Sequence, residues 1–303
     1  MAFRGSHGWL TPRCLMIPVL NAFGLTLALL GGANASTAPM ACLGDASQAA
    51  QPLSVAVVPQ LPQKVSYARW APLLEIIGHK TGQCFDLIIP PSIPEFEKIL
   101  YAGEPDFAFA NPYHMVVAKR EQGYIPLVID ARNKLTGLVV VKADSPIRNI
   151  QGLEGQVVAF PAPNAFAASL LIRAELAKQG IHIQPKYVKT HANGYRAVAV
   201  GDAVAAGGVN NTLKRENAGL QEVLRVLYET PGYTPHPFAA HPRVSAEIRQ
   251  AVTDAFLALG SDPANKKLLT DIQIPAPKVA NYQRDFVPLE LLNLESFTVN
   301  DAN

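Results

Sequence analysis

Three histidines stand where side-chain chemistry could act on a ligand. His114, His191 and His236 each lie next to the end of a predicted strand or in the loop that joins two predicted strands. Imidazole titrates near neutral pH, so such a trio could bind an anion when protonated, or a soft metal or metalloid when neutral. The alternative is that each ring bonds a nearby backbone carbonyl and has only a structural role.

The stretch around Asn111 could bind an anion without any catalytic group. Phe107–Ala110 is a short apolar run, typical of a strand that is covered on both faces, and Asn111-Pro112 is typical of a helix N-cap and first helical position. A helix N-terminus presents unpaired N–H groups and the positive end of the helix dipole. A carboxylate or phosphate could therefore bind there, beside Tyr113 and His114. The alternative is that Asn111 and Pro112 simply begin a helix.

The same kind of junction recurs along the chain. Asn164, Thr190 and Asn210 also follow predicted strands and are expected to cap the next helices. Each cap alone is ordinary. If the capped ends converge on one cleft, their N–H groups form a cage for an anion or a polar ligand.

The elements that position these residues alternate along the chain. Leu53–Val58, Phe85–Ile89 and Val157–Phe160 read as strands, and the apolar residues between Tyr67 and Lys80 recur at helical spacing. This βαβα order predicts an α/β fold with mostly parallel strands and helices on both faces of the sheet. The proline-rich segment 229–237 is too rich in proline for a central strand, so we expect an edge-like or hinge connection there.

The first 35 residues predict export. They contain Arg4 and Arg13 but no acid, then an apolar run, and they end in Ala33-Asn34-Ala35, which is typical of a secretory signal peptide cleaved after Ala35. Residues 36–51 read as a loose N-terminal arm. Cleavage leaves Cys42 and Cys84, which could form a disulfide in an oxidising compartment. The alternatives are one buried and one free thiol, or a thiolate site, although a zinc site is not expected.

Charge and motifs exclude several functional classes. The full chain has 26 basic and 24 acidic residues, and removal of residues 1–35 leaves 24 of each, with no basic tract. We therefore expect no nucleic-acid or membrane-surface partner. No Ser-His-Asp or Cys-His arrangement, HExxH motif, glycine-rich phosphate loop or acid pair stands out, so we expect no enzyme, no cofactor and no metal centre.

The order of several short motifs resembles the phosphate/phosphite/phosphonate substrate-binding proteins of ABC transporters. The resemblance covers residues 53–260, and its motifs are Val58-Pro59-Gln60-Leu61-Pro62, Trp70-Ala71-Pro72-Leu73-Leu74, Gly103–Ala108, Val139–Ser145, Leu153–Phe160 and the Thr190–Asn193 turn. It implies a two-lobed type II periplasmic binding protein fold with a ligand cleft between the lobes. Lobe one would be residues 52–136 with 237–303, and lobe two residues 137–236.

The resemblance also implies the residues of the ligand site. The family's hydroxyl-rich phosphonate turn maps to residues 164–169, where most hydroxyls are missing, and Asn210 stands where an acid can hold an aminoalkyl group. These departures leave the ligand open among phosphonate, other oxyanions and small polar or apolar molecules. The predicted ligand-binding residues are Asn111, Pro112, Tyr113, His114, Asn164, Ala165, Phe166, Ala167, Ser169, His191, Asn193, Tyr195, Asn210 and His236.

Three hypotheses about function follow. The first is a monomeric periplasmic protein that captures a small oxyanion for an ABC permease. The second is a ligand sensor whose closed form is read by a membrane sensor kinase. The third is a periplasmic enzyme acting on a small phosphorylated or carboxylated compound, because fold alone does not exclude catalysis.

Overall fold

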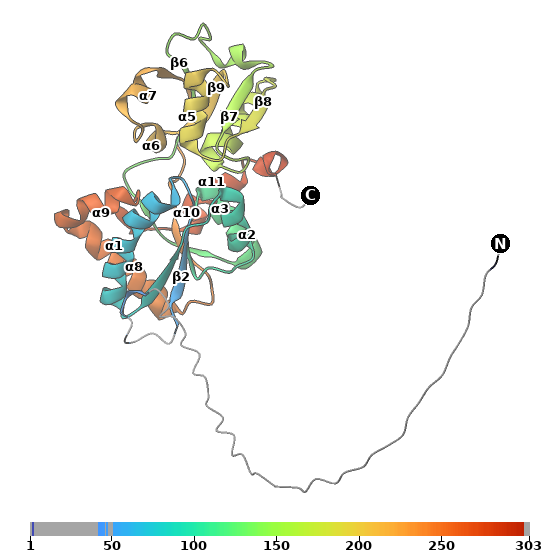
Figure 1. The fold of residues 1–303 in the computed structure, drawn as a ribbon. Helices are drawn as coiled ribbons and strands as arrows, with labels where there is room; N and C mark the ends of the chain where they lie inside the picture. Colours follow the sequence, from blue (N-terminus) through green and yellow to red (C-terminus); the bar gives the residue numbers. More distant parts are fainter. Residues whose placement is uncertain (1, 3–41, 46, 48–50, 300–303) are drawn as a thin grey trace. The chain divides into compact units, whose positions relative to one another are not determined.

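A computed structural model describes residues 2, 42–45, 47 and 51–299. The predicted signal peptide lies outside the described residues except for residue 2, as does much of the predicted arm. The described residues from Cys42 onward belong to one compact unit, 39–303. They form two β-sheets with helices packed around them (Figure 1).

The first sheet combines strands from both ends of the chain. Its order is β1-β3-β2-β4-β11-β5-β12. The strands are β1 (Leu43–Gly44), β2 (Leu53–Val57), β3 (Cys84–Ile88), β4 (Phe107–Phe109), β5 (Ile125–Asp130), β11 (Phe238–Ala240) and β12 (Pro277–Val279). Its helices are α1 (Gln63–Thr81), α2 (Ile93–Tyr101), α3 (Pro112–Gln122), α8 (Ala246–Ser261), α9 (Lys266–Asp271), α10 (Tyr282–Asp285) and α11 (Val287–Glu290).

The second sheet is built from the middle of the chain. Its order is β10-β6-β9-β7-β8. The strands are β6 (Gly137–Lys142), β7 (Val157–Phe160), β8 (Gln184–Tyr187), β9 (Ala205–Val209) and β10 (Leu224–Glu229). The helices are α4 (Leu171–Lys178), α5 (His191–Val200), α6 (Asn210–Leu213) and α7 (Ala218–Glu222), and a π-helical turn, η2 (Phe166–Leu170), precedes α4.

The α/β class is confirmed, but the expectation of mostly parallel strands is wrong. Each sheet contains three adjacent parallel strands, β3-β2-β4 in the first and β9-β7-β8 at one edge of the second. The other neighbouring pairs are antiparallel. The antiparallel strands include β6 and β11, which enter the sheets directly after the chain has crossed from one sheet to the other.

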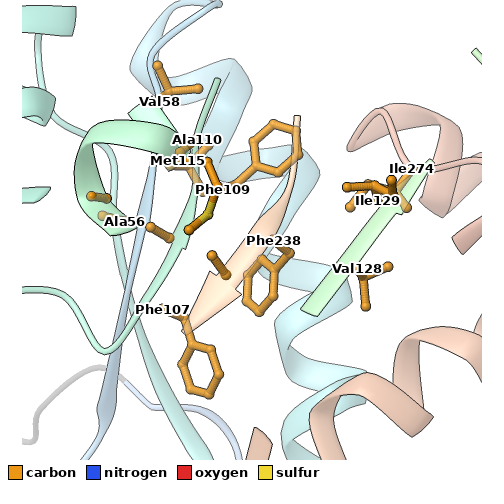
Figure 2. Close-up of a cluster of buried hydrophobic side chains, with 14 of the residues drawn as sticks. Ala56, Val58, Phe107, Phe109, Ala110, Met115, Val128, Ile129, Phe238 and Ile274 are labelled. Atoms are coloured by element: carbon orange, nitrogen blue, oxygen red, sulfur yellow. The ribbon is translucent and has the colours of Figure 1, made fainter. Parts of the chain in front are cut away.

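β11 is central rather than peripheral. It pairs with β4 on one side and with β5 on the other, and Phe238 is fully buried. The prolines of the preceding segment end at Pro237, just outside the ladder, so they remove no hydrogen bond from it. Figure 2 shows Phe238 beside Phe107 in this core, and their ring centroids are 5.5 Å apart.

Two crossing segments join the sheets. The chain leaves the first sheet after β5 and returns to it before β11. Leu135 of the first crossing and Tyr233 of the second form an antiparallel bridge, with N–H···O distances of 3.0 and 2.9 Å. The predicted connection at residues 229–237 is therefore confirmed as one of the two segments that join the sheets, and it pairs with the other segment through this bridge.

Capping residues explain several helix boundaries. Asn111 and Thr190 accept hydrogen bonds from the N–H groups of His114 and Asn193, as predicted for N-caps. Gly82 ends α1 in the left-handed conformation. The capping predictions for Asn164 and Asn210 are wrong, because the N-cap positions are Ala165 and Val209.

A disulfide joins the N-terminal arm to the first sheet. Cys42 and Cys84 are bonded, and the neighbouring residue pair Gly44 and Cys84 is in register between β1 and β3. The bond links positions 42 residues apart in sequence. This selects the disulfide among the alternatives that the sequence left open.

Candidate functional site

A small cavity lies between residues of the two sheets. Its volume is about 20 Å³, enough for one or two water molecules. Its lining comes from both sheets and both crossings: Val58, Gln60, Ile93, Asn111, Leu135, Ala165, Phe166, Ala167, Ala168, His191, Val209 and His236.

Strand direction explains why these residues meet. Gln60, Asn111 and Val209 follow or end the parallel strands β2, β4 and β9, and the carboxyl ends of such strands are where open α/β sheets bind ligands. His191 begins α5, which follows β8. His236 precedes β11, which runs antiparallel to β4. Because the start of an antiparallel strand lies at the edge where its parallel neighbours end, His236 lies at the same edge of the first sheet as Gln60 and Asn111.

His191 contributes a buried, neutral imidazole. It is the first residue of α5 and is 4% exposed, and its Nδ1 atom has no hydrogen-bond partner among the described residues. Burial lowers the pKa of His191 to about 4. The ring is therefore uncharged at neutral pH, and its unused nitrogen is available to a ligand.

A relay of side-chain amides fixes the tautomer of His236. Gln60 Nε2 lies 2.7 Å from His236 Nε2, and an amide nitrogen can only donate, so Nε2 accepts and the proton is on Nδ1. Gln60 Oε1 accepts from Gln273, whose own Oε1 accepts from Asn211 Nδ2 at 2.5 Å. Burial is the largest cause that lowers the pKa of His236, to about 3. This relay connects the two sheets beside the cavity.

His114 takes a different role from the other two histidines. It is fully buried, and its ring Nε2 lies 2.8 Å from Glu97 Oε1. The backbone N–H of His114 donates to Asn111 Oδ1. Glu97 lies on the buried face of α2 with Phe96 and Leu100. His114 therefore holds the Asn111 side chain in place through this hydrogen bond and does not itself line the cavity.

Asn164, which follows β7 of the second sheet, forms hydrogen bonds to Glu97 of α2 and to the C-terminal segment. Its Nδ2 donates to Glu97 Oε2 at 3.0 Å and to the carbonyl of Val299 at 2.8 Å, and its Oδ1 accepts from the N–H of Val299. Arg173 donates to the carbonyls of Pro163 and Phe297. The C-terminal segment is thereby held to residues of the second sheet.

The π-helical turn presses its backbone against the second sheet. A Cβ atom added to Gly137 or Gly207 would lie 2.1 Å from the carbonyl oxygen of Ala167 or Ala168, respectively. Glycine is therefore required in β6 and β9 for this approach. π-Helical turns often occur at functional sites, and here the turn brings residues 165–168 to the cavity.

Sequence comparison places this arrangement in a known family. The profile of a family described as "ABC transporter, phosphonate, periplasmic substrate-binding protein" matches residues 55–284, which include every residue that lines the cavity. The chain belongs to this family of phosphonate-transporter binding proteins. No curated protein sequence matches the chain.

Solved structures agree with the assignment to the phosphonate-transporter binding proteins. A binding protein component of an ABC phosphonate transporter from Pseudomonas aeruginosa has a TM-score of 0.72 at 17% identity, covering 84% of this chain and 90% of its own. PhnD1 from Prochlorococcus marinus in complex with methylphosphonate has a TM-score of 0.72 at 16% identity, with coverage of 82% and 98%. The periplasmic aliphatic sulphonate binding protein of Escherichia coli has a TM-score of 0.56 at 18% identity, with coverage of 82% and 92%.

These matches confirm the family and the fold that the sequence predicted. The fold is that of a two-lobed type II periplasmic binding protein, and at these identities the structural likeness supports the fold alone. Members of the phosphonate-transporter family are periplasmic binding proteins. Within the described part of the chain, no helix has the length and apolar character needed to cross a membrane.

The structure brings together only part of the predicted ligand set. Asn111, Ala165, Phe166, Ala167, His191 and His236 line the cavity. The other predicted residues, Pro112, Tyr113, His114, Asn164, Ser169, Asn193, Tyr195 and Asn210, do not line it.

Several of these eight have other contacts. The Tyr113 ring stacks on Phe166 with centroids 6.4 Å apart, and Ser169 Oγ accepts from Arg173. Tyr195 is buried in the second sheet's core, and its hydroxyl lies 2.7 Å from Thr212 Oγ1. His114 Nε2 lies beside Glu97, so His114 does not line the cavity together with His191 and His236. Among the described residues no group of three or more potential metal ligands is present.

Two polar residues of this region, Gln60 and Glu97, were not predicted from the sequence. Gln60 stands directly after a strand in Val58-Pro59-Gln60, a position that the strand-end rule could have indicated. Glu97 falls at the helical spacing of Ile93, Phe96 and Leu100, so an acid on the apolar face of α2 was the available signal.

Proposed function

We propose that the protein captures a small oxyanion of the phosphate or phosphonate kind and delivers it to an ABC permease. The observation that carries this proposal is the cavity, where the N-termini of α3 and α5 meet two buried imidazoles. Family membership supports the same role, and PhnD1 from Prochlorococcus marinus was solved with methylphosphonate.

The chemistry of the lining favours hydrogen bonding to the anion over ion pairing. His191 and His236 are neutral at pH 7, and none of the described lysines or arginines lines this cavity. Anions bind at helix N-termini through free N–H groups. In α3 only Tyr113 offers such a group within the first three residues, because Pro112 has no N–H and that of His114 donates to Asn111 Oδ1. The first turns of α5 and of the π-helical turn supply others. These groups would replace the hydroxyls that the Asn164–Ser169 run lacks.

Binding would involve movement of the lobes. The free space is smaller than a phosphate ion, so the lining must separate to admit a ligand and close again around it. We propose that the paired crossings at Leu135 and Tyr233 form the hinge, with lobe one at 52–136 plus 237–303 and lobe two at 137–236. The permease then recognises the closed monomer, without any chemical change to the ligand.

A thermal-shift screen tests the proposal. The purified protein is heated with phosphate, phosphite, methylphosphonate, sulfate, arsenite or small carboxylates, and calorimetry follows any hit. A ligand at 100 times its dissociation constant adds about 2.7 kcal/mol to the free energy of unfolding. His191→Gln is expected to weaken binding at least 10-fold, whereas His182→Gln, on an exposed histidine, serves as the matched control.

Two results would contradict the proposal. One is that no oxyanion raises the unfolding midpoint. The other is that an oxyanion binds equally well to the wild type and to His191→Gln, which would place the ligand elsewhere. Turnover of a bound compound would instead support the enzyme hypothesis.

A further inference from the structure

A larger, basic pocket adjoins the cavity. Its volume is about 260 Å³, and it shares two lining residues, Leu135 and His236, with the small cavity. Its other lining residues are Asp130, Asn133, Lys134, Asn210, Asn211, Lys214, Arg215, Pro235, Thr270, Gln273 and Pro275. We call it the basic pocket.

Positive side chains outnumber negative ones in the lining of the basic pocket, although Asp271 also acts electrostatically on Arg215. The lining has three cations, Lys134, Lys214 and Arg215, and none of them takes part in an ion pair among the described residues. Nη1 of Arg215 is buried and has no hydrogen-bond partner in the described chain. Arg215 as a whole is half-buried, but a buried guanidinium nitrogen without a partner is costly, and an anion would supply the missing partner.

The one carboxylate in this lining is already occupied. Asp130 accepts hydrogen bonds from the N–H and Nδ2 of Asn133, at 2.9 and 2.7 Å, and from the N–H of Ala276 at 3.0 Å. These contacts hold its carboxylate in place at the end of β5. It forms no ion pair with the three cations, so the pocket retains a net positive field.

The basic pocket is coupled to the cavity by the amide relay. Asn211 and Gln273 line the basic pocket, and their hydrogen bonds lead through Gln60 to His236, which faces both spaces. Gln273 adopts a left-handed backbone conformation, with φ of 68°. Such conformations are costly for residues other than glycine and cluster at functional sites.

We propose that the basic pocket binds a second anionic group of the same ligand, so that the cargo is a compact molecule with a phosphonate-like group at the cavity and a carboxylate-like group beside Arg215. This inference rests on the proposed function, because the first group must occupy the cavity. A planar guanidinium matches a carboxylate through two parallel hydrogen bonds, and Lys134 and Lys214 add attraction from the rim.

A matched pair of ligands tests the inference. Phosphonoacetate and its neutral amide, phosphonoacetamide, have nearly the same size and differ in the charge of the second group. Calorimetry at constant ionic strength should give phosphonoacetate a dissociation constant at least about 10-fold lower. Arg215→Gln and Lys134→Gln should each reduce this ratio, while Lys142→Gln, on an exposed lysine at the far end of β6, should leave it unchanged.

Each outcome decides the question. The inference would be overturned if the wild type bound phosphonoacetate and phosphonoacetamide equally well. It would also be overturned if the ratio of the two dissociation constants were unchanged in both Arg215→Gln and Lys134→Gln. In either case, methylphosphonate binding that depends on His191 would leave the proposed function intact. Acetate can also be added to the methylphosphonate complex. If acetate then strengthens methylphosphonate binding as much as the linked carboxylate of phosphonoacetate does, the basic pocket binds a free anion, and a second group on the same ligand is refuted. If no phosphonate binds at all, both proposals fail. Because Lys134 is exposed, its variant tests the pocket even if Arg215→Gln folds poorly.

Discussion

Burial of His191 as a neutral ring predicts acid sensitivity that a single substitution should reduce. The pKa of His191 is lowered to about 4 in the folded protein, against about 6.5 in an unfolded chain. As pH falls below 6.5 the unfolded state takes up a proton that the folded state does not. The free energy of unfolding therefore decreases with acid and stays low below pH 4.

The size of this effect follows from the two pKa values. Between pH 8 and pH 5, His191 lowers the free energy of unfolding by about 2 kcal/mol, and by about 3 kcal/mol at pH 4. His236, with a pKa of about 3, contributes a similar amount. For a domain of this size, 2 kcal/mol corresponds to a midpoint shift of roughly 4–8 °C.

The assay compares pH slopes rather than absolute stabilities. Urea unfolding of the wild type, His191→Gln and His182→Gln at pH 8, 7, 6 and 5 gives the loss of stability for each protein. We expect His191→Gln to lose about 2 kcal/mol less than the wild type across this range. His182 is exposed, so its variant should keep the wild-type slope. Identical slopes for all three proteins would refute the buried neutral state of His191.

Two further predictions concern the framework of the site. Cys42→Ser opens the disulfide and should lower the free energy of unfolding by about 4 kcal/mol, because the bond closes a loop across 42 residues; in urea unfolding, a reducing agent should destabilise the wild type but not this variant. Gly207→Ala places Cβ 2.1 Å from the Ala168 carbonyl oxygen and should cost about 3 kcal/mol. Gly219→Ala in α7 places Cβ at an ordinary contact distance, 3.5 Å from Asn217 Oδ1, and should be neutral or stabilising; equal effects would contradict the close packing of the π-helical turn.

The sequence predicted best the features that depend on neighbouring residues. The Asn111 and Thr190 caps follow from short side chains that bond N–H groups three residues ahead, and both are present. Alternating apolar runs and helical spacing gave the α/β class. Asn111 and His191, which stand at strand-to-helix junctions in the sequence, both line the cavity.

The features that the sequence did not predict depend on contacts between distant segments. β11 is three residues long and follows prolines, so no local pattern shows that it lies between β4 and β5. Asn164 has the type and position of an N-cap, yet its amide bonds Glu97 and Val299 instead. Local capping and long-range pairing compete for the same polar atoms, and only the folded chain shows which prevails.

We propose that the two polar clusters that flank the cavity link ligand binding to closure of the lobes. The Glu97–Asn164 contact and the Asn211–Gln273–Gln60 relay each join residues of the two sheets, so both form only when the lobes are together. Each hydrogen bond contributes only about 1 kcal/mol after its exchange with water. The clusters therefore stabilise the closed form modestly, and the unpartnered His191 Nδ1 and Arg215 Nη1 oppose it. A ligand that satisfies these two atoms removes the opposing term, which makes closure depend on the ligand.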